Sequence, residues 1–113
     1  MNPSPTPVLD LLRDPAKWTK HFLARNAEGK AISPVSDGAV CFCLVGACEQ
    51  VYKDAVPGDV LRSRAVSNTA QLKIYDTLIQ LGCIDRSEFL PSFNDSPSTT
   101  HADVIRVLEK AKV

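Results

Sequence analysis

The stretch AVCFCLVGAC, residues 39–48, decides how the centre of the chain folds and holds three of its four cysteines. Residues 38–53 contain no proline and become polar towards their end, which is typical of a helix. Ser36 or Asp37 can cap the first amides of such a helix. Because the first half is apolar on all sides, the sequence predicts a central, buried helix near residues 37–53.

A strand is the alternative for the same stretch, because Val, Cys and Phe are tolerated in strands and Cys41 and Cys43 would then share one face. The length of the stretch favours the helix. On a helix, at about 100° per residue, Cys41 and Cys48 lie on nearly the same face, while Cys43 points to the opposite side. We therefore expect small buried cysteines that, aided by Gly46 and Ala47, let helices approach closely.

Length and composition predict one folded domain. The chain has 113 residues, of which 44% are hydrophobic and 23% charged, far from the polar composition of disordered proteins. Residues 1–7 contain three prolines and are expected to form a flexible lead-in. Residues 8–113 are expected to form the single globular domain.

Turn and cap signals divide the first third of the chain. The apolar pattern of residues 8–12 predicts a short amphipathic turn. Asp14 followed by Pro15 is typical of a helix start. The tetrad Asn26-Ala27-Glu28-Gly29 can form a tight turn, since glycine adopts the positive φ that such a turn needs. The sequence therefore predicts a β-hairpin near residues 20–33.

Two further helices are predicted in the second half. Asp59 or Ser67 can start one near residues 60–81, with Gly82 as its left-handed end. The segment 85–98 is expected to be an ordered loop, and Thr100 with Asp103 resembles a capping box for a helix near 100–111. The fold class predicted is mainly α (α+β): a compact bundle of about three principal helices with a short hairpin.

The balanced charge and the lack of targeting signals argue against nucleic-acid binding and against membrane insertion. Thirteen basic and thirteen acidic side chains cancel, so a nucleic-acid role has no electrostatic support. No apolar stretch approaches the roughly 18 residues that cross a bilayer, and the N-terminus lacks an export signal. We therefore expect a cytoplasmic protein without membrane contact, with its four cysteines reduced and without a cofactor.

A metal site is not expected, because the cysteine spacing differs from the paired ligands that zinc prefers and no second pair stands beside Cys83. A thiol nucleophile is the sharper alternative, with Cys43 as thiolate, His101 as base and Asn94 or Asp95 to orient the imidazole. Against it, a Cys43 inside a helix would have nothing to lower its pKa.

A small ligand pocket is the preferred candidate site. Trp18, Phe93, Asn94 and Asp95 could line it together, since an aromatic and a carboxylate can hold a ligand. Asn and Asp also cap turns routinely, and this scaffold role is the favoured interpretation of Asn94 and Asp95.

Short motifs relate the chain to a known family. They are Trp18-Thr19, Gly29, Ala39-x3-Cys43-Leu44-x-Gly46-Ala47, Phe93-Asn94-Asp95 and Thr100-x3-Val104-x3-Leu108-x2-Ala111. With them the chain resembles a family of small bacterial and phage proteins of unknown function, whose pattern has tryptophan where Phe42 and Phe93 stand here. The resemblance implies a shared small helical fold and supplies no activity.

The absence of a catalytic signature, the balanced charge and the small size favour a non-enzymatic binding or interaction protein. Its partner, a protein or a small molecule, and its oligomeric state stay open. The alternative is a small thiol-dependent hydrolase or transferase that uses Cys43 and His101.

Overall fold

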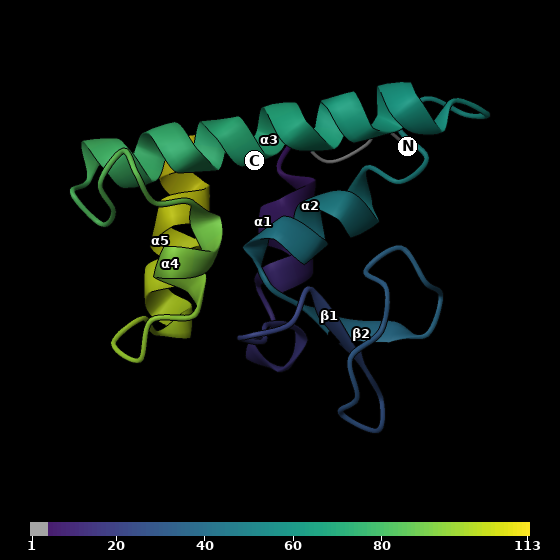
Figure 1. Cartoon of the computed structure of the whole chain (residues 1–113), viewed down its shortest axis with the longest axis horizontal. Helices are drawn as coiled ribbons and strands as arrows, with labels where there is room; N and C mark the ends of the chain where they lie inside the picture. The colour runs from purple at the N-terminus through teal and green to yellow at the C-terminus, as the bar shows by residue number, and fades with distance from the viewer. Residues whose placement is uncertain (1–4) are drawn as a thin grey trace.

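Helix α3 (Val60–Gln80) forms one long edge of the molecule, and the other elements lie on one side of it (Figure 1). The computed structural model describes residues 5–113. The remaining elements are α1 (Pro7–Leu12), the 3-10 helix η1 (Pro15–Lys17), β1 (Ala24–Asn26), β2 (Ala39–Phe42), α2 (Leu44–Val51), α4 (Leu90–Asn94) and α5 (His101–Ala111). The predicted fold class is confirmed: three longer helices, α2, α3 and α5, accompany a short two-stranded antiparallel hairpin.

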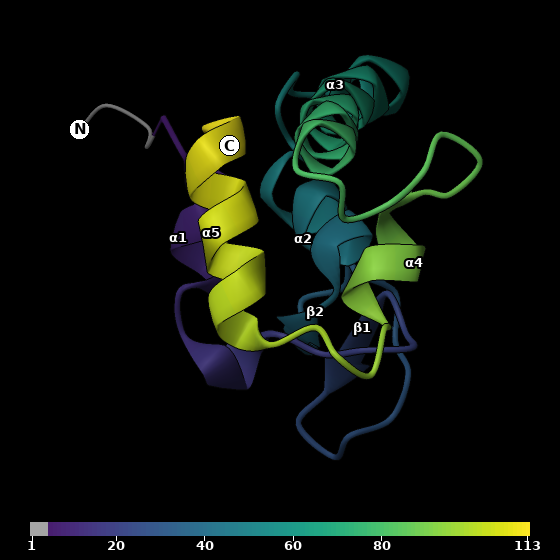
Figure 2. The same ribbon diagram turned by 90° about the vertical axis from the view of Figure 1, so that its left-hand side faces the viewer.

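The hydrophobic core lies where α1, α2, α3 and α5 meet, as the view turned by 90° shows (Figure 2). Helix α3 contributes Ala70, Ile74 and Leu78, and α5 contributes Val104 and Leu108. The amide of Leu9 in α1 donates a hydrogen bond to the carbonyl of Val113, at 3.1 Å. The first and last helices are therefore joined through backbone as well as side chains.

The predicted helix at 37–53 is wrong in its first half. Residues 39–42 form strand β2, Cys43 is the N-cap, and α2 begins at Leu44. Burial alternates along the strand, since Val40 is exposed and Phe42 is buried, and this alternation gives Phe42 a place in the core. The predicted caps have other roles: the Ser36 hydroxyl accepts a hydrogen bond from the amide of Gly38 in the loop before β2.

The hairpin is present, but its second strand differs from the expected one. Strand β1 pairs antiparallel with β2, with Ala24 opposite Phe42 and an irregularity after Arg25. The predicted turn does form, since the Gly29 amide donates to the Asn26 carbonyl at 2.9 Å and Gly29 has φ +79°. The segment after the turn adds only an isolated bridge at Ala31. The main partner of β1 comes from the stretch expected to be helical.

The predicted helix ends agree with the structure at most positions. Asp59 rather than Ser67 caps α3, Gly82 adopts φ +73° after it, and Thr100 forms the capping box of α5 with Asp103. The segment expected to be a loop at 85–98 contains the short helix α4. Of the expected flexible lead-in, residues 1–4 lie outside the described residues, whereas Pro7 already belongs to α1.

Candidate functional site

Asn94, the last residue of α4, joins three separate parts of the chain. Its Oδ1 accepts hydrogen bonds from Trp18 Nε1 at 2.8 Å and from the Leu44 amide at 3.1 Å. Its Nδ2 donates to the Thr19 carbonyl at 3.0 Å and to Asp95 Oδ1 at 2.9 Å. The side chain is 1% exposed, and these four bonds use both donors and both lone pairs of the amide. Asn94 therefore has an internal, structural role.

Asp95 fixes the segment that leads into β1. Its Oδ1 also accepts a hydrogen bond from the His21 amide at 2.8 Å, and His21 has φ +74°, a left-handed conformation that is uncommon for a side chain of this size. Lys20 Nζ donates to the Ser96 carbonyl at 2.6 Å and lies 5.4 Å from the centre of the Trp18 ring. The Asn94-Asp95 pair thus holds residues 18–21 against α4.

Cys43 lies at the start of α2 rather than inside a helix. Its Sγ accepts a hydrogen bond from the Gly46 amide at 3.4 Å. Burial raises the pKa of the Cys43 thiol above its ordinary value, the amides of Gly46 and Val45 lower it less, and the charge of Asp95 adds to the rise. The position at a helix start favours a thiolate, but desolvation is the larger effect. The thiol is therefore protonated at neutral pH.

His101 is engaged elsewhere. Its Nε2 lies 2.6 Å from the carbonyl oxygen of Leu12, and its ring centre is 6.1 Å from that of Trp18. Within residues 5–113, no hydrogen bond joins Cys43 to His101. The histidine that shares a pocket with Cys43 is His21, and the sequence carries no motif that marks it.

Three of the four residues expected to form one ligand pocket are linked, and the fourth faces elsewhere. Trp18, Asn94 and Asp95 are joined by the hydrogen bonds above. Asn94 and Asp95 line a pocket of about 150 Å³ together with Cys43, whereas Phe93 lines a different pocket beside Cys83. In the pocket of about 150 Å³, the Asn94 amide has no hydrogen-bonding group left for a ligand, because its four internal bonds use them all.

A larger cavity, of about 420 Å³, opens between α2 and α3, and we call it the α2–α3 groove. It is lined by Glu49, Tyr52, Lys53 and Asp54 from α2 and the turn after it, by Val60, Ser63, Arg64 and Ser67 from α3, and by Ser33 and Val35 from the loop before β2. The groove therefore combines two acidic, two basic and several apolar or hydroxyl side chains.

The groove exists because α3 presents serines where its core stripe continues towards the N-terminus. Ser67 and Ser63 are buried and lie about one and two helical turns before Ala70 on the same face, so no large side chain fills the space against α2. The spacing of these serines is a signal that the sequence does contain. The sequence alone does not predict the groove from this spacing, because a polar residue in an apolar helical stripe normally marks the end of the stripe.

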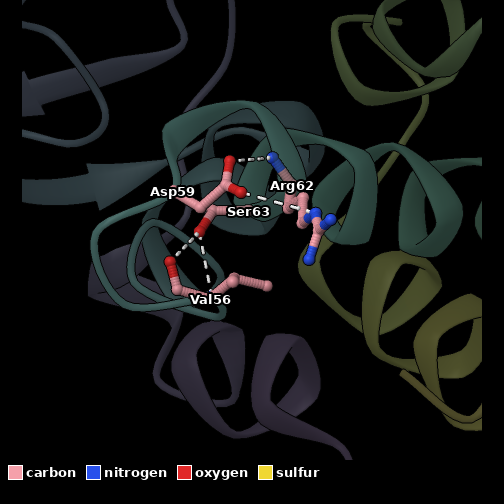
Figure 3. A network of polar contacts seen from close by, with 4 residues as sticks. All are labelled: Val56, Asp59, Arg62 and Ser63. Carbon is pink, nitrogen blue, oxygen red and sulfur yellow. Dashed lines mark hydrogen bonds and ion pairs between the residues drawn. The ribbon is translucent and has the colours of Figure 1, made fainter.

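A network of polar contacts fixes the start of α3 beside the groove (Figure 3). The Ser63 hydroxyl accepts from the Val56 amide at 3.0 Å and donates to the Val56 carbonyl at 3.2 Å. Asp59 Oδ1 accepts from the Arg62 amide at 3.0 Å, and its other oxygen lies 3.4 Å from Arg62 Nε. These contacts hold one wall of the groove in place.

Charged groups line the side of the groove towards α2. Lys53 Nζ lies 3.6 Å from Asp37 in the loop before β2, which ties that loop to the groove. Burial raises the pKa of the Tyr52 phenol, so Tyr52 is neutral at physiological pH and can donate a hydrogen bond. Side chains of both charges and a neutral donor are therefore available to a bound molecule.

Among residues 5–113, no three His, Cys, Asp or Glu side chains lie close enough together to hold a metal ion. No helix in the same range is long and apolar enough to cross a membrane.

Comparison with known proteins relates the whole length of the fold to one family. A search of curated proteins and a search of solved structures found no match. The model of a family of unknown function, DUF6197, matches residues 7–112, which include every helix and strand described above. The chain therefore belongs to the family of unknown function DUF6197.

Proposed function

We propose that the protein is a non-enzymatic binding protein and that its ligand occupies the α2–α3 groove. The observation that supports the proposal is the groove itself: a cavity of about 420 Å³ whose charged side chains lie outside the core. A concave site that combines apolar surface with a few polar groups is the usual form of a small-molecule site.

The lining indicates the chemistry of the ligand. Arg64 and Lys53 can pair with an anionic group, and Glu49 with a cationic one. Val35 and Val60 provide apolar surface between them. A small molecule that carries both a carboxylate and an ammonium group on an apolar body, such as a free aliphatic or aromatic amino acid, satisfies all three requirements.

The thiol-enzyme alternative has less support. Burial holds the Cys43 thiol in its protonated form, and His101 is bonded to the Leu12 carbonyl. A nucleophile needs a base within hydrogen-bond reach, and the geometry at Cys43 offers this alternative no support.

We also infer that the protein works in the cytoplasm of a bacterium or of a phage-infected cell. All four cysteines are unpaired, as expected in a reducing compartment. The balanced charge of the chain argues against nucleic acid as its partner.

The proposal is tested by nuclear magnetic resonance, with ¹⁵N-labelled protein titrated with L-leucine and L-phenylalanine. We expect saturable shifts of the amides of Tyr52, Lys53 and Arg64. The doubly blocked N-acetyl amide of each amino acid lacks both charges and should leave these amides unchanged.

Arg64→Ala should abolish the shifts, because it removes the cationic group that α3 contributes. Lys73→Ala is the matched control, since Lys73 is an exposed cation on the same helix outside the groove. The proposal is overturned if neither amino acid shifts the groove amides, or if Arg64→Ala and Lys73→Ala behave alike.

A further inference from the structure

The outer face of α3 is exposed from Leu61 to Leu72, whereas Tyr75 and Ile79 nearer its C-terminal end are half-buried against the chain's own core. All other elements lie on one side of this helix in both views (Figures 1 and 2). Large apolar side chains nevertheless point outward from it: Leu61 is 77% exposed and Leu72 is 55% exposed. A leucine that is three-quarters exposed gains nothing from the fold of its own chain.

These leucines belong to a regular stripe. Leu61, Ala65, Asn68, Leu72, Tyr75 and Ile79 follow one another at spacings of four, three, four, three and four residues. This is the spacing of the seam in a two-stranded coiled coil. The stripe lies about half a turn around the helix from the core residues Ala70, Ile74 and Leu78, so its exposed leucines do not pack in the chain's own core. Tyr75 is also bonded within the chain, since its hydroxyl donates to the Arg86 carbonyl at 2.9 Å.

We propose that this outer stripe of α3 pairs antiparallel with the same stripe of a second copy of the chain. With the two-fold axis near residue 70, Leu61 meets Ile79 of the second copy, and the small Ala65 meets the large Tyr75. Large residues opposite small ones are what a closely packed seam requires. In the two layers next to the axis, Leu72 of each copy meets Asn68 of the other.

The charges beside the stripe are complementary only in the antiparallel arrangement. Arg62 and Asp76 lie on the same flank of the stripe, near its two ends. Antiparallel pairing brings Arg62 of each copy to Asp76 of the other, which forms two equivalent ion pairs. Parallel pairing would place Arg62 beyond the end of the partner helix and Asp76 beside the amide of Gln71.

Arg62 can leave its contact with Asp59 at little cost. Arg62 lies 3.4 Å from Asp59 of its own chain, but the side chain of Arg62 is 79% exposed, and such exposed ion pairs contribute about 1 kcal/mol or less. The stripe from Leu61 to Ile79 is about 27 Å long at 1.5 Å per residue. An interface of this size is small, so the dimer should be weak and its population should rise with concentration.

Sedimentation equilibrium over a wide concentration series tests the proposal. The protein should shift from monomer to dimer as concentration rises. Leu72→Glu places a charge in the centre of the seam and should weaken association about tenfold or more. Val40→Glu is the matched control, because Val40 is a comparably exposed apolar residue on β2 and should leave association unchanged.

Charge reversal tests the antiparallel register. Arg62→Asp alone and Asp76→Arg alone each place like charges opposite one another, and each should weaken association about tenfold. The double variant Arg62→Asp/Asp76→Arg restores opposite charges and should return association to within about threefold of the original. Circular dichroism and thermal melting of each variant establish that it is folded.

Three results would overturn the proposal. The first is a protein that stays monomeric at its highest soluble concentration. The second is association that Leu72→Glu and Val40→Glu affect equally, which would place the interface elsewhere. The third is a double variant no better than the single ones, which would exclude the antiparallel register.

Discussion

Asn94 shows how much of the structure depends on a single buried amide. Three elements that are distant in sequence, the segment before β1, the start of α2 and α4, share its hydrogen bonds. Trp18, Phe93, Asn94 and Asp95 could be grouped from the sequence because aromatic side chains beside an amide and a carboxylate can hold a ligand. The sequence could not indicate that the Trp18 indole is the partner of Asn94, because the two residues are separated by 76 positions.

Replacement of Asn94 by alanine should destabilise the protein by about 2–4 kcal/mol, because it leaves buried donors and acceptors on Trp18, Thr19 and Leu44 without partners. Chemical denaturation followed by tryptophan fluorescence measures the loss. Gln80→Ala, an exposed amide on α3, serves as the control and should change stability by less than about 0.5 kcal/mol. Equal effects of the two substitutions would show that the Asn94 bonds do not stabilise the fold.

The four thiols should differ in reactivity because they differ in burial. Burial raises the pKa of the Cys48 thiol to about 12 and also raises that of Cys43, so both are protonated at neutral pH. Cys41 and Cys83 are half-buried. Alkylation of the native protein, mapped by mass spectrometry, should therefore modify Cys41 and Cys83 first, and Cys43 and Cys48 mainly after denaturation.

His101→Ala should leave this order unchanged, because His101 is bonded to the Leu12 carbonyl. Rapid alkylation of Cys43 that depends on His101 would contradict the protonated state assigned to this thiol. It would also revive the thiol-enzyme alternative.

At the scale of elements, the capped helices were predictable and the strand-to-helix junction was not. Asp59 and Thr100 are strong caps with turn residues before them, and both start helices where the sequence predicts. The junction at Cys43 has no such signal, because a thiol is a weak acceptor and cysteine is not among the preferred caps. The sequence of residues 38–53 therefore predicts one continuous helix.

Tertiary contact decides the junction. A Cβ at Gly46 would lie 1.8 Å from the carbonyl oxygen of Leu23, so only glycine lets α2 approach the chain just before β1 this closely. The same Leu23 carbonyl accepts a hydrogen bond from the Cys43 amide at 3.2 Å. Gly46 was expected to bring two helices together, but the structure places a backbone segment there.

The capping box of α5 should make stability depend on pH. The hydrogen bond from the Thr100 amide lowers the pKa of the Asp103 carboxyl, so the ionised form stabilises the folded state. This contribution is present above the unfolded pKa, about 3.9, and is lost as the pH falls through the lower folded pKa.

Asp103→Asn removes the titrating group, so the original protein should be more stable than the variant near neutral pH, and this difference should shrink as the pH falls below about 4. Urea denaturation of both proteins across this range measures the difference. A difference that stays constant from neutral to acid pH would show that the ionised carboxylate of Asp103 does not stabilise the fold.

At the scale of the whole molecule, the sequence predicted the class of fold but not its cavities. The periodicity of α3 places Ala70, Ile74 and Leu78 on one face, and all three are buried, whereas Leu81, which continues the same spacing, lies past the helix end and is exposed. The α2–α3 groove depends on how far the buried Ser63 and Ser67 hold α2 from α3, which is a property of the packed structure. The charges of Lys53 and Arg64 come together only once both helices are in place.

The contact between α1 and α5 has a consequence for synthesis on the ribosome. Helix α1 leaves the exit tunnel long before α5, but the carbonyl that binds the Leu9 amide belongs to Val113. The buried side chains of α1, among them Val8 and Leu12, pack into a core that also needs α5. Vectorial synthesis therefore keeps α1 without its final partner until α5 has emerged, and the core closes only then.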